Sequence, residues 1–206
     1  PDVGKSGQHQ GRDAGDVGGR HAGSREHLVV GIGIDPTGED RFARRGDIDR
    51  VNERVYRSVN NGVYRAGFAR SQEAYEEAFD ELFEALDMLE ARLATRRYLC
   101  GDMPSEADWR LFPTLMRFDV AYFGAFKCNL RRIQDYPNLW GYVRELYQMP
   151  GIAATCDLDV YKQGYYSISE LRNPLGIVPK GPAVDFSTPH GRRNVNDGIG
   201  QSAAVS

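Results

Sequence analysis

The sequence has few cysteines, no long apolar run and no excess of basic residues. Its 206 residues contain three cysteines, far apart and without a Cys-x-x-Cys pair, so neither a disulfide framework nor a zinc site is expected. No apolar stretch approaches the roughly 18 residues of a membrane span, and no signal-peptide pattern is visible. The formal net charge is -3, which gives no electrostatic reason to expect nucleic acid or an anionic membrane as a partner. These absences predict a cytoplasmic protein without a bound metal.

Residues 1–45 lack apolar periodicity. Glycines alternate there with His, Arg, Asp and Ser, and a segment of this kind buries too little surface to offset its ordering entropy. We therefore expect residues 1–45 to be disordered. Leu28–Asp35 could form one isolated strand, although a strand without a partner is marginal. The segment contains no cysteine, and its composition is what an off-frame translation of GC-rich DNA would look like.

From Asp47 onward the chain has helical patterns. Apolar residues recur every three or four positions, first from Ile48 to Val59 and then, more strongly, from Tyr75 to Leu93. Ser71 is the expected N-cap of the second helix. Its apolar stripe lasts under three heptads, which favours the core of a helical bundle over a two-stranded coiled coil.

A Ser-x-x-Asp box at Ser105 and Asp108 predicts the start of another helix, since each side chain can bond the backbone N–H of the other. A catalytic acid role for Asp108 is the less favoured alternative. Pro113 predicts a bend in this helix, because it lacks an N–H. Further helices are expected near Pro137–Tyr147, Ile152–Cys156 and Asp159–Tyr166. The domain is thus expected at 46–170, followed by an extended or disordered tail at 171–206.

The run Asn60–Phe68 is interpreted as a site, because it places Tyr64 between two glycines at the junction of two patterned helices. Together with the stretch Tyr98–Asn129, it resembles the C-terminal half of the glutathionyl-hydroquinone reductases, the Xi-like branch of the glutathione transferases. The resemblance extends from about residue 48 to about residue 192. The capping box and the YPNLW helix are shared by many transferases. The narrower assignment depends on NNGVYRAGF and FKCN.

The resemblance implies an all-α fold, the C-terminal helical bundle of glutathione transferases. It also implies an activity, in which the thioether of a glutathionyl-hydroquinone is cleaved with a second glutathione to give hydroquinone and glutathione disulfide. Glutathione is then a co-substrate, and the other ligand is a small aromatic molecule. The family places its nucleophilic cysteine and most glutathione contacts in an N-terminal thioredoxin-like domain, which this sequence does not show. Pairing as a homodimer is implied as well.

By motif position, the family's three tyrosines correspond to Tyr64, Tyr122 and Tyr165. Tyr64 is the candidate proton donor to the departing aromatic carbon, assisted by the other two phenols. A purely structural role in packing remains an alternative for Tyr122 and Tyr165. Two departures bear on the site: Ala125 and Gly164 stand where the family usually or commonly has histidine.

The cysteines offer no clear nucleophile. Lys127, Arg131 and Arg132 could lower the pKa of Cys128, although the family has a cysteine there beside its separate nucleophile. Two hypotheses result. The first is the helical half of a reductase, with little or no activity alone. The second is a non-catalytic helical module for ligand binding or dimerisation. Measuring hydroquinone release separates them.

Overall fold

The computed structural model describes residues 39–195, with side chains from Arg45 onward. These residues belong to one compact unit. Between residues 39 and 195 there is no β-strand, and only isolated bridges join Tyr98 to Gly101 and Ser169 to Asn173. The expected all-α fold is confirmed. The elements in chain order are α1 (Glu39–Arg54), η1 (Val55–Asn60), α2 (Gly62–Gly67), α3 (Gln72–Leu93), α4 (Glu106–Arg117), η2 (Phe118–Tyr122), α5 (Phe123–Ala125), η3 (Ile133–Asp135), α6 (Pro137–Tyr147), η4 (Ala153–Thr155) and α7 (Leu158–Tyr165).

Two sequence expectations remain predictions. The strand proposed for Leu28–Asp35 lies outside the described residues, and the division of the chain at residues 45 and 170 stays a prediction. The first helix begins earlier than its apolar pattern suggested, because α1 starts at Glu39 rather than near Asp47.

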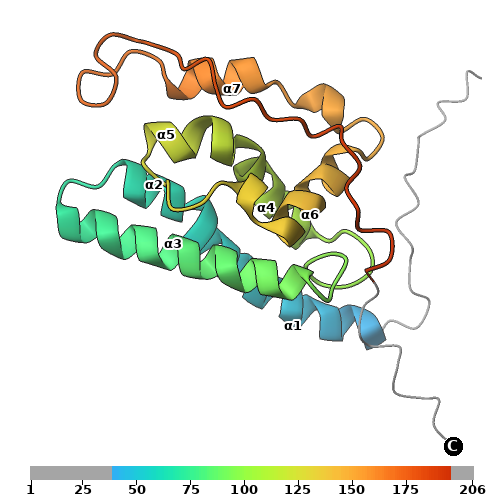
Figure 1. Cartoon of the computed structure of the whole chain (residues 1–206). Coiled ribbons are helices and arrows are strands. Elements are labelled where there is room, and N and C mark those ends of the chain that lie inside the picture. The colour runs from blue at the N-terminus through green and yellow to red at the C-terminus, as the bar shows by residue number, and fades with distance from the viewer. Residues whose placement is uncertain (1–38, 196–206) are drawn as a thin grey trace, which may run out of the picture. The chain divides into compact units, whose positions relative to one another are not determined.

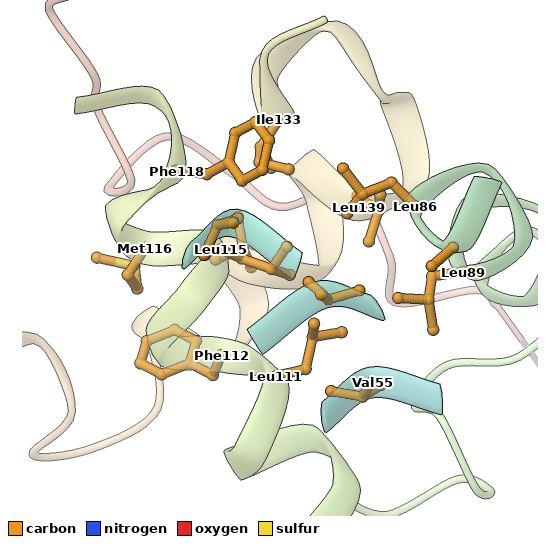
Figure 2. Packing of buried hydrophobic residues seen from close by; sticks show 14 of the residues in the cluster. Val55, Leu86, Leu89, Leu111, Phe112, Leu115, Met116, Phe118, Ile133 and Leu139 are labelled. Atoms are coloured by element: carbon orange, nitrogen blue, oxygen red, sulfur yellow. The ribbon is translucent and has the colours of Figure 1, made fainter. Parts of the chain in front are cut away.

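Helix α3 provides the longest apolar face of the bundle. The Oγ atom of Ser71 accepts a hydrogen bond from the backbone N–H of Ala74 at 3.2 Å, which confirms the predicted N-cap. Leu82, Leu86 and Leu89 are fully buried, and Figure 2 shows Leu86 and Leu89 directed toward the core that also contains Leu111 and Leu115 of α4. The stripe therefore forms bundle core, as predicted.

Asp108 links the start of α4 to its neighbours. Its buried carboxylate accepts hydrogen bonds from the backbone N–H of Ser105 at 2.7 Å and of Leu99 at 2.9 Å, and from the Tyr142 hydroxyl at 2.8 Å. With so many partners, Asp108 acts as a structural anchor, and the alternative of a catalytic acid finds no support.

The chain does not leave α-helical geometry at Pro113, where the sequence predicted a bend. It does so only at Phe118, where the π-helical turn η2 begins.

The tail after α7 is extended and packed on the bundle. In Figure 1 it is drawn in red and runs back along the helices. Phe186 is buried and contacts the rings of Trp140 and Tyr147. Arg192 is 3% exposed and donates hydrogen bonds to the carbonyl of Leu93 at the end of α3 and to those of Arg96 and Arg97 just after it. Up to residue 195, the alternative of a disordered tail is therefore wrong.

Candidate functional site

The three predicted tyrosines meet through their hydroxyl groups, although they come from different elements. Tyr64 lies in α2, Tyr122 ends η2 and Tyr165 ends α7. The Tyr165 hydroxyl oxygen is 2.6 Å from that of Tyr64 and 2.9 Å from that of Tyr122. The remaining pair, Tyr64 and Tyr122, is 3.4 Å apart. We call these three residues the tyrosine cluster.

The cluster has a buried end and an accessible end. Tyr122 is 1% exposed, whereas Tyr64 is 39% exposed, so a ligand in solvent can reach Tyr64 first. Burial raises the pKa of Tyr122 far above its usual range, and hydrogen bonds with Tyr165 and Tyr64 raise it further. Burial is also the main reason that the pKa of Tyr165 is raised. Both groups therefore remain neutral phenols at neutral pH, able to donate a hydrogen bond to a charged neighbour.

Phe126 forms the aromatic floor of the cluster. Its ring centroid lies 5.4 Å from those of Tyr64 and Tyr122 and 5.7 Å from that of Tyr165. Gly67 makes this packing feasible, because a Cβ atom there would lie 2.2 Å from the Phe126 ring. The sequence reasoning did not assign Phe126 a role, although it is the phenylalanine of the FKCN motif.

The helical geometry at both ends of the cluster is unusual. The chain between α1 and α2 is the π-helix η1 (Val55–Asn60), and Tyr122 ends the π-helix η2. The run around Tyr64, at the junction of the two patterned helices, is therefore itself helical. Single π-helical turns are rare in proteins, and those that occur are often found at functional sites. Here η2 is held by Asp119, whose carboxylate accepts hydrogen bonds from the backbone N–H groups of Ile133 at 2.6 Å and Gln134 at 3.2 Å.

The environment of Cys128 does not activate its thiol. Cys128 is fully buried, and burial raises its pKa to about 12. Two of the three cations expected to lower this pKa are engaged elsewhere, since Arg131 bonds Asp87 and Arg132 bonds Asp135. Burial likewise raises the pKa of Cys100, and the thiol of Cys156 lies 3.5 Å from the carbonyl oxygen of Ile152. The alternative of Cys128 as nucleophile therefore finds no support.

A cavity adjoins the tyrosine cluster through Tyr165. Its volume is about 410 Å³, and it lies between the α5 region and the loop that follows α7. Ala125 lines this cavity. A Cβ atom at Gly164 would meet no other atom within 4 Å, so a larger side chain has space there. The lining comprises Gly124, Ala125, Lys127, Tyr165, Tyr166, Ser167, Ser169, Leu171, Arg172, Asn173, Ile177 and Pro179.

Between residues 39 and 195, no three His, Cys, Asp or Glu side chains lie close enough together to hold a metal ion. None of the helices in that same range combines the length and apolarity needed to cross a membrane.

Comparison with known proteins identifies the class of this fold. The sequence profile of the glutathione S-transferase C-terminal domain matches residues 72–145. The glutathionyl-hydroquinone reductase PcpF of Sphingobium chlorophenolicum is 58% identical over 139 residues, which are 68% of this chain and 44% of PcpF. The glutathionyl-hydroquinone reductase YqjG of Escherichia coli is 51% identical over 145 residues, 70% of this chain and 44% of YqjG.

Solved structures agree with these relatives. The glutathione-bound structure of E. coli YqjG superimposes with a TM-score of 0.71 at 50% identity, covering 73% of this chain and 49% of that one. The Xi class transferase of Natrialba magadii gives a TM-score of 0.72 at 45% identity, and the match covers 74% of this chain and 48% of the Natrialba chain. The chain therefore contains a glutathione S-transferase C-terminal domain, and over this domain it is similar to the glutathionyl-hydroquinone reductases and the Xi class glutathione transferases. It spans about half the length of the relatives it matches.

Proposed function

We propose that this domain supplies the tyrosine-lined half of a glutathionyl-hydroquinone reductase site, with Tyr64 as the proton donor. The observation that carries the proposal is the meeting of three phenol oxygens, with Tyr64 at the accessible end and Tyr165 2.6 Å from it. The two relatives named as reductases supply the reaction class.

The reaction requires a proton at the aromatic carbon that leaves the sulfur. A thiolate attacks the thioether sulfur, a sulfur–sulfur bond forms, and the bond between sulfur and the aromatic carbon breaks. The electron pair of that bond stays on the aromatic carbon, which takes a proton to give the hydroquinone. A second thiolate, from glutathione, then attacks the mixed disulfide, releasing the first thiolate and forming glutathione disulfide. In the net reaction, the aromatic carbon is reduced and two thiols are oxidised to one disulfide, so the reaction needs no other oxidant or reductant.

Tyr64 can provide the proton because its phenolate would be stabilised by its neighbours. After transfer, the Tyr64 oxygen can accept hydrogen bonds from the phenols of Tyr165 and Tyr122, which stand 2.6 and 3.4 Å away. Burial keeps the pKa of both neighbours raised, so they remain protonated donors. Tyr122 and Tyr165 thus assist Tyr64 by stabilising its anion.

The thiol belongs, in this proposal, to a thioredoxin-like domain that also holds most of the glutathione. The cysteines of the helical domain suit the task poorly, since Cys100 and Cys128 are buried with raised pKa values. We therefore expect the 206 residues alone to release little hydroquinone. The proposal includes the cytoplasm as the compartment, in keeping with three unpaired thiols, and a homodimer as the assembly.

The test transfers this domain into a complete relative. In a chimera, residues 48–192 replace the matching segment of E. coli YqjG, and hydroquinone release from glutathionyl-menadiol is measured with glutathione. We expect turnover in the chimera, a loss of about 100-fold on Tyr64→Phe, and little turnover by the 206-residue chain. Full activity of the Tyr64→Phe chimera would refute the proton-donor role. Robust turnover by the 206-residue chain would refute the assignment of the thiol to another domain.

A second candidate function has one observation in its favour. The 410 Å³ cavity beside Tyr165 has room for a small ligand without any reaction. A non-catalytic ligand-binding module would bind glutathionyl-menadiol in the chimera and leave it uncleaved.

A further inference from the structure

The cavity beside the tyrosine cluster is lined by two cations and no acid. Lys127 comes from the segment after α5 and Arg172 from the loop after α7, and none of the twelve lining residues is Asp or Glu. Within residues 45–195, the ion pairs involve other arginines and His190, and no carboxylate pairs with Lys127 or Arg172. Glu170 belongs to the same loop but lies outside the lining. Two positive charges therefore face one cavity without a balancing charge from the described chain.

Arg172 connects the cavity to the tyrosine cluster. Its guanidinium carbon lies 4.1 Å from the ring centroid of Phe68 and 5.6 Å from that of Phe126. Phe68 in turn stacks beside Tyr64, with ring centroids 6.3 Å apart and planes inclined by 12°. A guanidinium that rests with its face on an aromatic ring keeps the N–H groups of its edge free, in the fork geometry that matches a carboxylate. Arg172 is thus placed to hold an anion close to Tyr64.

Lys127 has an uncommon backbone conformation that the surrounding structure holds in place. Its φ angle is 60°, in the left-handed region where residues other than glycine are infrequent. The Tyr75 hydroxyl donates a hydrogen bond to the carbonyl of Lys127 at 2.7 Å, and the N–H of Lys127 donates to the carbonyl of Gly124 at 3.3 Å. Such conformations concentrate at functional sites, because neighbouring contacts must maintain them. Here the contacts that hold this backbone conformation place Lys127 at the wall of the cavity.

The rest of the lining suits an organic ligand, not an inorganic ion. The lining also contains the apolar residues Leu171, Ile177 and Pro179 and the aromatic residue Tyr165. Ser167 and Ser169 add hydroxyl groups that can donate hydrogen bonds. An apolar wall with a few polar groups is the usual character of a small-molecule pocket.

We infer that this cavity binds a carboxylate of the substrate, through Arg172 and Lys127, while the aromatic part lies toward Tyr64. The inference deepens the proposed function, because it names a substrate class for the same site: an aromatic ligand that carries a carboxylate. The carboxylate has two sources in the proposed reaction, a substituent on the hydroquinone ring or the glutathionyl group. The shared chemistry is a carboxylate held by a guanidinium and an ammonium group.

The test measures binding by titration calorimetry on the 206-residue chain and needs no turnover. The probes are 2,5-dihydroxybenzoate and hydroquinone, which differ by one carboxylate, and S-methylglutathione for the other source. The variants are Arg172→Gln and Lys127→Asn, since asparagine tolerates the left-handed conformation. Arg193→Gln is the matched control, because it removes one exposed cation outside the cavity. Unfolding midpoints of all variants verify that each one folds.

We expect 2,5-dihydroxybenzoate to bind about tenfold more tightly than hydroquinone, and either cavity variant to remove most of that preference. Arg193→Gln should leave the preference unchanged, and added salt should weaken it. If S-methylglutathione alone loses affinity in the two variants, the carboxylate is that of the glutathionyl group. The inference is overturned if neither carboxylate probe loses affinity in either variant. Glutathionyl-menadiol turnover in the unmutated chimera tests the proposed function separately, because the binding titrations on the 206-residue chain involve no bond cleavage.

Discussion

Tyr64 and Tyr165 are 101 residues apart in the chain, and their hydroxyl oxygens are 2.6 Å apart. This contact ties the short helix α2 to the end of α7 and places the more buried phenol beside the accessible one. If Tyr64 donates the proton, Tyr165 is the closest group to stabilise the phenolate that remains.

Replacing Tyr165 by phenylalanine in the YqjG chimera should therefore reduce kcat/KM about 10- to 100-fold. The lost interaction is a hydrogen bond to a charged oxygen, which is stronger than one between neutral groups. Steady-state kinetics with glutathionyl-menadiol measures the effect. Tyr56→Phe is the control, since Tyr56 is 58% exposed and outside the cluster. Equal losses in the two variants would argue against a specific role for Tyr165.

The motifs located the three tyrosines, but they could not show that the hydroxyl groups meet. Helix α3 and its Ser71 cap were predictable, because apolar spacing and capping are local properties. The position of Tyr165 depends on how α7 packs on η2, and no local pattern carries that information. Phe68 and Phe126 lay within the quoted motifs and received no role, since their ring contacts are tertiary.

The tail was not predictable for a related reason. Phe186 and Arg192 are single anchors separated by extended chain, so no helical or strand period marks them. Proline and glycine density alone indicated a loose segment. The cavity cation Arg172 was missed because it lies in this same region without a pattern.

The thiols should differ sharply in reactivity. Cys156 is half-buried, whereas Cys128 is fully buried with a pKa raised to about 12, and burial also raises the pKa of Cys100. Because the thiolate is the reactive form, alkylation of the folded chain near neutral pH should modify Cys156 first. Mass spectrometry of iodoacetamide-treated protein identifies the site, and Cys156→Ser should leave the folded chain almost unmodified. Rapid labelling of Cys128 in that variant would contradict the assigned environment.

A methyl group at Gly67 should disturb the floor of the tyrosine cluster. The Cβ atom of Gly67→Ala would lie 2.2 Å from the Phe126 ring, so the ring or α2 must move. Overpacking of this kind costs about 1 to 3 kcal/mol of unfolding free energy, measurable by urea denaturation. Gly164→Ala is the matched control, because its Cβ atom meets nothing within 4 Å and alanine favours a helix. A neutral effect at Gly67 would show that Phe126 is free to move.

Arg192 should stabilise the domain although it lies in the tail. Its guanidinium donates to the carbonyl of Leu93 at the end of α3 and to those of Arg96 and Arg97 in the turn after it, and all three would lose this donor. Arg192→Met should lower the unfolding free energy by about 2 to 4 kcal/mol. Arg193→Met, at an exposed neighbouring position, should change it by about 0.5 kcal/mol or less. Equal urea midpoints for the two variants would show that the tail contributes little.

Asp119 should make the stability of the domain depend on pH. This carboxyl is buried in η2, three residues before Tyr122, and burial raises its pKa to about 6. In the unfolded chain its pKa is about 3.9, so the folded state binds more protons between these values. The stabilisation that this group contributes is therefore complete below about pH 4 and is lost as the pH rises through about 6.

Asp119→Asn isolates that contribution, because asparagine keeps an acceptor oxygen but does not titrate. The unfolding free energy of the wild-type chain, relative to that of Asp119→Asn, should fall by about 2 to 3 kcal/mol from pH 4 to pH 7. Urea denaturation of both proteins across that range measures the difference, and the comparison cancels the other carboxylates. A difference that stays constant with pH would mean that Asp119 is ionised with an ordinary pKa in the fold. The anchor that holds η2, and with it Tyr122, would then be a charged carboxylate throughout the working range.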